Sequence, residues 1–136
     1  MDKKRPILVV DDDQVDIMTI KRALRENDIQ NDILTATNGE KAIDVLEHES
    51  KKPNIILLDV NMPKMNGIEF LKVIKRDQRY KNIPVVVLTS SKEMEDIRQS
   101  FELGVAGYMV KPIDYLDFHL LIKKIIQYWE MSEFAY

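Results

Sequence analysis

Short apolar runs alternate with amphipathic segments along the whole chain. Uninterrupted apolar runs at Ile7–Val10, Ile55–Leu58 and Val85–Leu88 predict strands that are buried on both faces. Weaker runs at Ile33–Ala36 and Gly107–Val110 predict two further short strands. The chain therefore has five candidate strands, spread over most of its length.

Each candidate strand is followed by a segment with apolar residues at helical spacing. The expected helices cover residues 13–25, 40–48, 67–76, a segment from Ser90 or Ser91 to Gly104, and a segment from Pro112 to about Trp129. Asp13 and Asp114 are candidate N-caps. Ser90 with Glu93 matches a capping box, and Gly104 suits a left-handed position after a helix.

Strands that alternate with helices and are joined by short connections predict an α/β fold. The strands would lie parallel in one sheet with helices on both faces and right-handed crossovers. A chain of 136 residues suits one domain with its own core. We expect residues 1–136 to form a single domain, with a core at about 6–129 and a C-terminal tail at 130–136.

Composition narrows the class of protein. Apolar residues make up 45% of the chain, but no apolar stretch approaches the length of a membrane helix, so we expect no membrane insertion. The chain has no cysteine, which excludes disulfides, thiolate zinc sites and thiol catalysis and agrees with a cytoplasmic location. The net charge of −3 and the absence of a basic block argue against direct nucleic-acid binding.

Polar residues stand where the apolar runs end. Asp11 and Asp12 follow the first run, Asp59 follows the run at Ile55–Leu58, Thr89 follows the next run, and Lys111 follows the last. Ligands of open α/β sheets bind beyond the carboxyl ends of the strands, where these residues would converge. Carboxylates, a hydroxyl and an ammonium together suit a hard cation and a phosphoryl group.

A simpler interpretation of the acidic residues is that they cap helices, and Asp13 is best explained in that way. Two adjacent carboxylates at a buried strand end would repel each other unless a cation lies between them. We therefore interpret Asp11 and Asp12 as part of a metal site. His48 and His119 fall within expected helices, away from the strand ends, and we expect both to be solvated.

The chain resembles the receiver domain of two-component response regulators, from Ile7 to about Tyr128. The resemblance is carried by four segments: Val9-Val10-Asp11-Asp12, Leu57-Leu58-Asp59-Val60-Asn61-Met62-Pro63, Thr89-Ser90 and Lys111-Pro112. It implies the flavodoxin-like, CheY-like fold, a doubly wound (βα)5 arrangement with strand order 2-1-3-4-5. It also implies a response regulator without an output domain, phosphorylated by a sensor histidine kinase or a histidine phosphotransfer protein and signalling by phosphorylation-dependent protein binding.

The resemblance also implies a role for each polar residue. Asp59 would accept the phosphoryl group, and Asp12, Asp59 and the backbone carbonyl of Asn61 would bind Mg²⁺ or Mn²⁺, with Asp11 acting through water. Lys111 would pair with the acceptor and then with the phosphoryl group, and Thr89 would donate its hydroxyl to it. The Lys111–Pro112 peptide bond would be cis, with Pro112 directing the lysine into the site.

Tyr108 stands three residues before Lys111, where receivers carry their switch aromatic. We predict that it moves together with Thr89 on phosphorylation. The alternative is a static, half-buried core residue.

The last expected helix is more apolar than one sheet face requires. Leu116 and Leu120 fall opposite its main apolar stripe, and Trp129, Phe134 and Tyr136 follow near the end of the chain. These residues predict an interface, with a homodimer as its simplest form; alternatively, the tail folds back on its own domain. The aromatic ending also resembles receivers that partner phytochrome-type histidine kinases.

Three other functions compete with a phosphoryl-accepting receiver. An aspartate-nucleophile phosphatase would carry a second acid two residues after the nucleophile, where this chain has Asn61. A flavin or nucleotide domain would need a glycine-rich loop after the first strand, where three aspartates would repel phosphate. A degenerate receiver used as a scaffold would not need the complete set of acceptor residues. We expect no enzymatic activity beyond metal-dependent self-phosphorylation and slow self-dephosphorylation.

Overall fold

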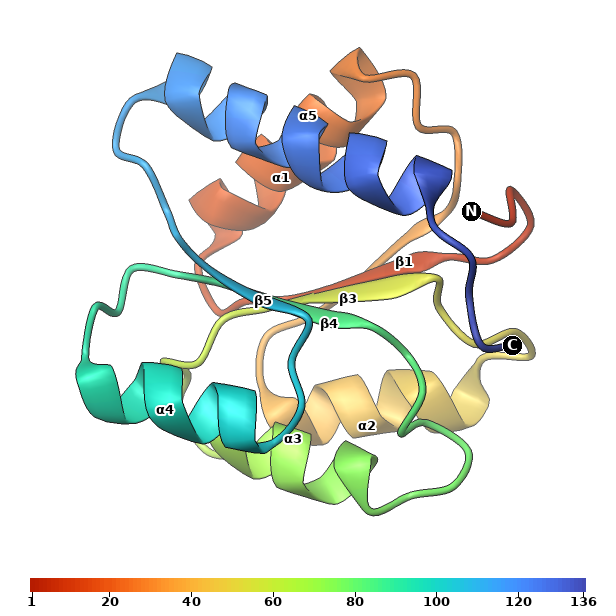
Figure 1. The fold of residues 1–136 in the computed structure, drawn as a ribbon, viewed down its shortest axis with the longest axis vertical. Helices are drawn as coiled ribbons and strands as arrows, with labels where there is room; N and C mark the ends of the chain where they lie inside the picture. Colours follow the sequence, from red (N-terminus) through yellow and green to blue (C-terminus); the bar gives the residue numbers. More distant parts are fainter.

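The five apolar runs form one parallel sheet in the computed structural model, which describes residues 1–136 (Figure 1). The strand order is β2-β1-β3-β4-β5, which confirms the predicted doubly wound α/β fold. The strands are β1 (Ile7–Val10), β2 (Ile33–Ala36), β3 (Ile55–Leu58), β4 (Val85–Thr89) and β5 (Gly107–Val110).

The register of the sheet aligns the carboxyl ends of its strands. Val10 pairs with Leu58 across β1 and β3, and Thr89 pairs with Val110 across β4 and β5. Asp11, Asp59 and Lys111 each follow the last residue of a strand directly. The sheet therefore brings them to one edge, as the sequence predicted.

Helices cover both faces of this sheet. They are α1 (Gln14–Glu26), α2 (Gly39–His48), α3 (Gly67–Lys75), α4 (Met94–Glu102) and α5 (Tyr115–Met131). Helices α1 and α5 lie on one face, and α2, α3 and α4 lie on the other (Figure 1). Alternate strand residues face the two layers, so that Leu8 and Val10 pack in one buried cluster and Ile7 and Val9 in the other.

Local hydrogen bonds decide where the helices begin and end. Asp13 and Asp114 accept backbone hydrogen bonds at the starts of α1 and α5, which confirms both predicted caps. Gly104 adopts φ +84° after α4, as predicted for a left-handed position. The predicted capping box of Ser90 and Glu93 is wrong, because α4 begins only at Met94 and Glu93 caps it without a side-chain bond.

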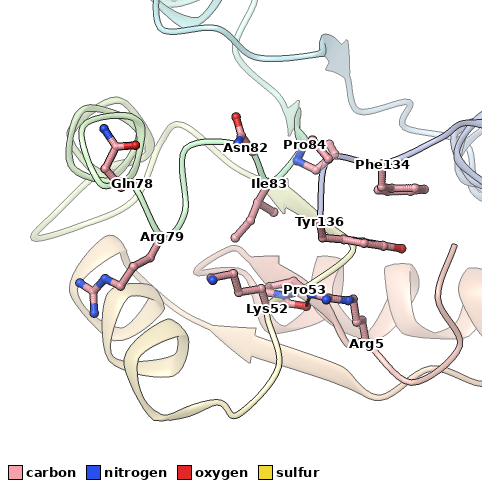
Figure 2. A pocket seen from close by; sticks show the side chains of 11 residues that line it. Arg5, Lys52, Pro53, Gln78, Arg79, Asn82, Ile83, Pro84, Phe134 and Tyr136 are labelled. Carbon is pink, nitrogen blue, oxygen red and sulfur yellow. Dashed lines mark hydrogen bonds between the residues drawn. The ribbon is translucent and has the colours of Figure 1, made fainter.

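The C-terminal tail folds back over the amino-terminal ends of the strands, the alternative that the sequence left open. The Tyr136 hydroxyl donates to Asn54 Oδ1 at 2.9 Å and accepts from the backbone N–H of Asp2 at 3.0 Å. The Arg5 guanidinium lies 4.0 Å from the centre of the Tyr136 ring, and Figure 2 shows both beside a cavity of about 240 Å³. None of the helices has the length and apolar character needed to cross a membrane.

Candidate functional site

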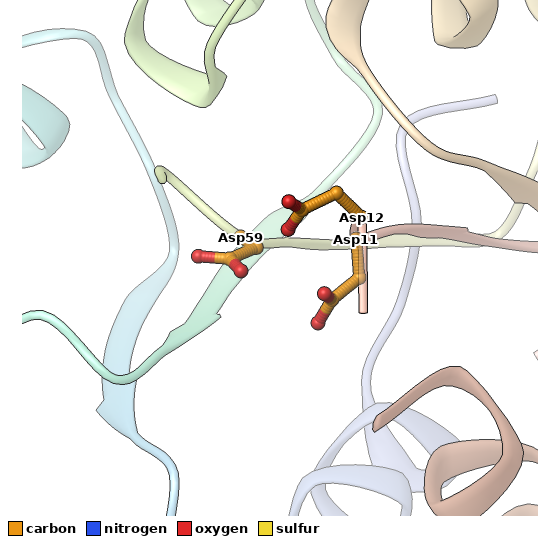
Figure 3. A group of neighbouring side chains, drawn as sticks. All are labelled: Asp11, Asp12 and Asp59. Atoms are coloured by element: carbon orange, nitrogen blue, oxygen red, sulfur yellow. The ribbon is translucent and has the colours of Figure 1, made fainter. Parts of the chain in front are cut away.

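Three aspartates meet at the carboxyl edge of the sheet (Figure 3). Asp11 and Asp12 follow β1, Asp59 follows β3, and one oxygen from each carboxylate lies within 4.8 Å of the others. Asp11 and Asp59 are buried, with 1% and 7% of their surfaces exposed, whereas Asp12 is exposed. The group thus has a solvent-facing side, which it needs if a cation or a phosphodonor is to reach it.

The two oxygens of Asp59 differ in their surroundings. Oδ1 accepts a hydrogen bond from the Thr89 hydroxyl at 2.6 Å and another from the backbone N–H of Asn61 at 3.1 Å. The hydrogen bond to Oδ2 comes from the Lys111 ammonium and is long, at 3.5 Å. Thr89 is fully buried at the end of β4, and its hydroxyl lies beside Asp59, while its predicted contact with a phosphoryl oxygen stays a prediction.

Lys111 is the one cation among these carboxylates. Its ammonium donates to Asp11 Oδ2 and to Asp16 Oδ2, both at 2.7 Å, and its side chain is only 6% exposed. Burial disfavours the charged form, but the hydrogen bonds to Asp11 and Asp16 outweigh burial and raise the pKa of Lys111. Lys111 is therefore held as an ammonium at the site, although closer to those two carboxylates than to Asp59.

The buried position of Asp11 disfavours its charged form. Burial raises its pKa to about 6, although the hydrogen bonds from Lys111 and from the backbone N–H of Asp13 act in the opposite direction. A buried carboxylate with a raised pKa, beside two further carboxylates and a single lysine, is short of positive charge. An oxygen-only donor set with this charge deficit fits a hard divalent cation.

Asp16 is the site residue that the sequence analysis missed. It lies in the first turn of α1, five positions after Asp11, and its carboxylate reaches Lys111 across the end of the sheet. The available signal was a second acid in the first turn of a helix that already has an acidic cap. Acidic residues are common in first turns because they interact favourably with the helix dipole. An acid at this position therefore does not by itself predict a contact with Lys111.

The predicted cis peptide bond between Lys111 and Pro112 is wrong, because the structure contains no cis peptide bond. The trans form is the more stable isomer of an X–Pro bond, by about 0.5–1 kcal/mol. Lys111 reaches Asp11 and Asp16 with a trans bond, and its backbone N–H donates to the Thr89 carbonyl at 2.8 Å.

The loop between β3 and α3 forms the wall next to Asp59. A depression beside the aspartates is lined by Asp12, Val60, Asn61, Met62, Pro63 and Asn66. An unpredicted capping box between Asn66 and Glu69 fixes the start of α3. Gly67 then packs so tightly that an added Cβ would lie 2.4 Å from the Asp59 carbonyl oxygen. The loop and helix start thereby hold the backbone that carries Asp59.

Tyr108 lies half-buried on β5, which β4 separates from the β3 strand that precedes Asp59. Its hydroxyl donates to the Ser91 carbonyl at 3.0 Å, and Ser91 in turn donates its N–H to the Thr89 hydroxyl at 3.3 Å. Burial raises the pKa of Tyr108. A continuous path of contacts therefore joins Asp59, Thr89, Ser91 and Tyr108. The movement of Tyr108 on phosphorylation stays a prediction.

The remaining predicted residues lie away from this edge. On α5, Leu116 and Leu120 are exposed at 75% and 46%. Trp129 on the same helix and Phe134 in the tail are half-buried against each other, with ring centres 5.5 Å apart. Neither histidine joins the site: His48 is exposed on α2, and His119 on α5 lies 3.0 Å from a carboxylate oxygen of Glu26. His119 is therefore less solvated than predicted.

Comparisons with known proteins agree with this geometry. The family model described as "Response regulator receiver domain" matches residues 7–123. Response regulator Rcp1 of Synechocystis is 34% identical over 128 residues, covering 90% of this chain and 87% of Rcp1. The crystal structure of the phosphorylated cyanobacterial phytochrome response regulator RcpA superimposes with a TM-score of 0.91 at 32% identity, covering 98% of this chain and 99% of RcpA. The Mn²⁺-bound structure of Rcp1 gives 0.89 at 33% identity and covers 97% and 99% of the two chains.

Proposed function

We propose that this chain, which belongs to the response regulator receiver domain family, accepts its phosphoryl group on Asp59 and signals through phosphorylation-dependent protein binding. Receiver domains take a phosphoryl group on an aspartate in two-component signalling, and they act as signalling proteins rather than as true enzymes. The observation that carries the choice of Asp59 is its buried carboxylate, which accepts from Thr89 and has Lys111 within 3.5 Å.

The chemistry of the transfer follows from the two oxygens of Asp59. A carboxylate oxygen attacks the phosphorus of the donor, forming an aspartyl phosphate while the bond between phosphorus and the donor's leaving group breaks. The Thr89 hydroxyl and the Lys111 ammonium are the donors that would bind phosphoryl oxygens, because both lie beside the Asp59 carboxylate. The leaving group departs towards solvent on the exposed side of the site.

We propose that the cation is Mg²⁺, with Mn²⁺ as a substitute. Asp12, Asp59 and the backbone carbonyl of Asn61 would hold it, with Asp11 acting through water, since Asp11, Asp12 and Asp59 form the acidic group of the site. A bound cation supplies positive charge for the phosphoryl oxygens, which Lys111 alone cannot neutralise. The Mn²⁺-bound form of the similar Rcp1 supports a divalent metal of this kind.

We expect Mg²⁺ to stabilise the folded protein against heat. A ligand that binds only the native state at about ten times its dissociation constant adds about 1.4 kcal/mol, which is roughly 4 °C in melting temperature for a domain of this size. Differential scanning fluorimetry measures the shift. Asp12→Ala should remove most of it, whereas Asp117→Ala, which deletes an exposed acid on α5, should keep it. An equal shift in both variants would contradict the metal assignment.

The Mg²⁺-dependent shift should shrink as the pH falls from 7 to 5. The pKa of Asp11 is raised from 3.8 to about 6, so the metal-free folded state binds a proton at Asp11 more tightly than the unfolded chain does. Without metal, this group therefore favours folding more as the pH falls through 6 towards 4. Protons then compete with Mg²⁺ for the site, and isothermal titration at pH 7 and pH 5 measures the loss of affinity. Equal affinities at both pH values would contradict it.

Receiver domains accept phosphoryl groups from histidine kinases or phosphotransfer proteins. We propose a phytochrome-type histidine kinase as the donor, since the similar RcpA is a phytochrome response regulator. The donor would contact exposed apolar side chains around the site: Val15 and Met18 on α1 are 69% and 68% exposed, and Ile113 before α5 is fully exposed. These side chains are close in sequence to Asp16 and Lys111, and the contacts of Lys111 to Asp16 and Asp59 place both segments at the edge of the sheet that carries Asp59.

We expect Met18→Glu to slow phosphorylation by such a kinase about tenfold, because a buried unpaired charge at a protein contact costs roughly 1–3 kcal/mol. Phosphorylation by acetyl phosphate should stay unchanged, since that donor needs no docking surface. Val73→Glu on α3 is the matched control, because it places the same charge at an exposed apolar position of the opposite layer. Radiolabel transfer measures both reactions, and a parallel loss with acetyl phosphate would contradict a docking role.

We propose that the partner surface for signalling is the exposed side of α5, with self-association as its first use. Leu116 and Leu120 project to solvent there, and an apolar depression between β5 and α5 is lined by Met109, Leu121 and Trp129, among others. Tyr108 packs on the opposite face of the sheet, but its neighbour Met109 lines this depression, so a movement of β5 at Tyr108 would carry a phosphorylation signal to α5. The acidic net charge favours protein partners over nucleic acid or a membrane.

Beryllofluoride with Mg²⁺, a phosphoryl mimic, should strengthen a dimer in light scattering. A specific interface needs roughly 1,200 Å² of buried surface, more than two leucines supply, so we expect dissociation in the micromolar range. Leu120→Asp should prevent the dimer, and Val73→Asp should leave it intact. A strict monomer in both states, or a dimer that tolerates Leu120→Asp, would reject this surface.

A further inference from the structure

We propose that Asp16 is a positioning residue that draws Lys111 away from Asp59 in the unphosphorylated protein and thereby weakens the binding of the phosphoryl group. The inference rests on the proposed function of Asp59. It starts from an unequal division of contacts: the Lys111 ammonium is 2.7 Å from Asp16 and from Asp11, but 3.5 Å from the acceptor carboxylate.

Lys111 has no spare hydrogen-bond capacity. An ammonium has three N–H donors, and the three carboxylate contacts use all of them. The side chain is 6% exposed, so water contributes little to its solvation. The donor that now faces Asp59 is available to a phosphoryl oxygen, but Lys111 can move closer to Asp59 only if one of its two 2.7 Å contacts lengthens.

Asp16 is the contact that opens at the lowest cost. Asp11 has 2% of its side chain exposed, and a carboxylate buried to that degree becomes an uncompensated charge when its cation leaves. The Asp16 side chain is 29% exposed, so water can replace Lys111 as its partner. Asp16 would thus compete with the phosphoryl group for Lys111.

The competing explanation is that Asp16 only stabilises α1, by placing a negative charge at the positive end of its helix dipole. Asp117 provides the matched case, because it also lies in the first turn of a helix capped by an aspartate but has no contact with Lys111. A dipole effect should appear equally at both positions. Competition for Lys111 should appear at Asp16 alone.

The test is the affinity for beryllofluoride at saturating Mg²⁺, measured by isothermal titration calorimetry. Loss of a hydrogen bond to a charged group typically changes an equilibrium constant roughly tenfold. Asp16 is partly solvated and asparagine can still accept a hydrogen bond, so the change should be smaller. We expect Asp16→Asn to bind beryllofluoride about fivefold more tightly than wild type. Asp16→Glu, which keeps the charge, should return towards wild type, and Asp117→Asn should equal wild type. Unchanged or weaker binding by Asp16→Asn would overturn the proposal.

A metal-free measurement separates this proposal from the proposed function. In EDTA, Asp16→Asn should speed proton exchange at the Lys111 ammonium, followed by nitrogen-15 NMR of the Nζ group, because one of its two short contacts is weakened. Equal exchange in the variant and in wild type would overturn the role of Asp16. If the wild-type chain instead takes no phosphoryl group at Asp59, the proposed function fails, and the exchange rates still decide whether Asp16 holds Lys111.

Discussion

Asp59→Asn is expected to abolish phosphorylation by acetyl phosphate, with a loss of at least about 100-fold in rate, because an amide is not a nucleophile towards phosphorus. The substitution keeps the shape of the side chain. Its oxygen can still accept from Thr89 and from the Asn61 N–H, so we expect a folded protein. Intact-protein mass spectrometry after incubation with acetyl phosphate and Mg²⁺ measures the phosphoryl mass.

Two controls separate loss of the nucleophile from loss of the metal. Asp12→Asn removes a carboxylate from the same acidic group but leaves Asp59, so higher Mg²⁺ should restore its reaction. Asp117→Asn should react like wild type because it lies on α5. Phosphorylation of Asp59→Asn at the wild-type rate would contradict the assignment of the acceptor.

Of the substitutions that add one methyl group near the site, we expect Gly67→Ala to lower the free energy of unfolding the most. The new Cβ would lie 2.4 Å from the Asp59 carbonyl oxygen and 2.6 Å from the Val60 Cα, and both are backbone atoms that cannot rotate away. Overpacking of this kind costs roughly 1–3 kcal/mol. Because relief of the clash must move the backbone of Asp59, phosphorylation should slow as well.

Gly107→Ala is the matched control for this prediction. Its added Cβ would meet only the flexible end of Met109, at 3.4 Å, so we expect a change within about 0.5 kcal/mol. Urea unfolding compares the two variants with wild type. Similar stabilities for Gly67→Ala and Gly107→Ala would show that the close approach of α3 to Asp59 does not constrain the site.

Most of the fold could be predicted because its signals are local and strong. The buried runs of β1 and β3 begin and end where the apolar residues do, at Ile7–Val10 and Ile55–Leu58. Parallel strands then bring the residues that follow them to one edge, which places Asp11, Asp59, Thr89 and Lys111 together without further information. This part of the site follows from periodicity and topology.

The features that the sequence did not predict have a different physical origin. They depend on contacts between distant segments or on the choice between conformations of similar energy. Asp16 is a site residue only because Lys111, 95 positions later, reaches it. Helix α4 begins later than predicted, at Met94, and Ser91 donates its hydroxyl to Asp96 at 2.6 Å within the first turn of the helix. The tail could have folded either way, and its contacts from Tyr136 to Asp2 and Asn54 decide the outcome.

The most direct test of the central claim is to locate the phosphoryl group on the wild-type chain. Acetyl phosphate and Mg²⁺ are added, the aspartyl phosphate is reduced with borohydride, and the converted residue is found by peptide mass spectrometry. We expect a single converted residue at Asp59, dependent on Mg²⁺ and absent from Asp59→Asn. Conversion at Asp12 or Asp11 instead, or at Asp59 equally without a divalent cation, would contradict it.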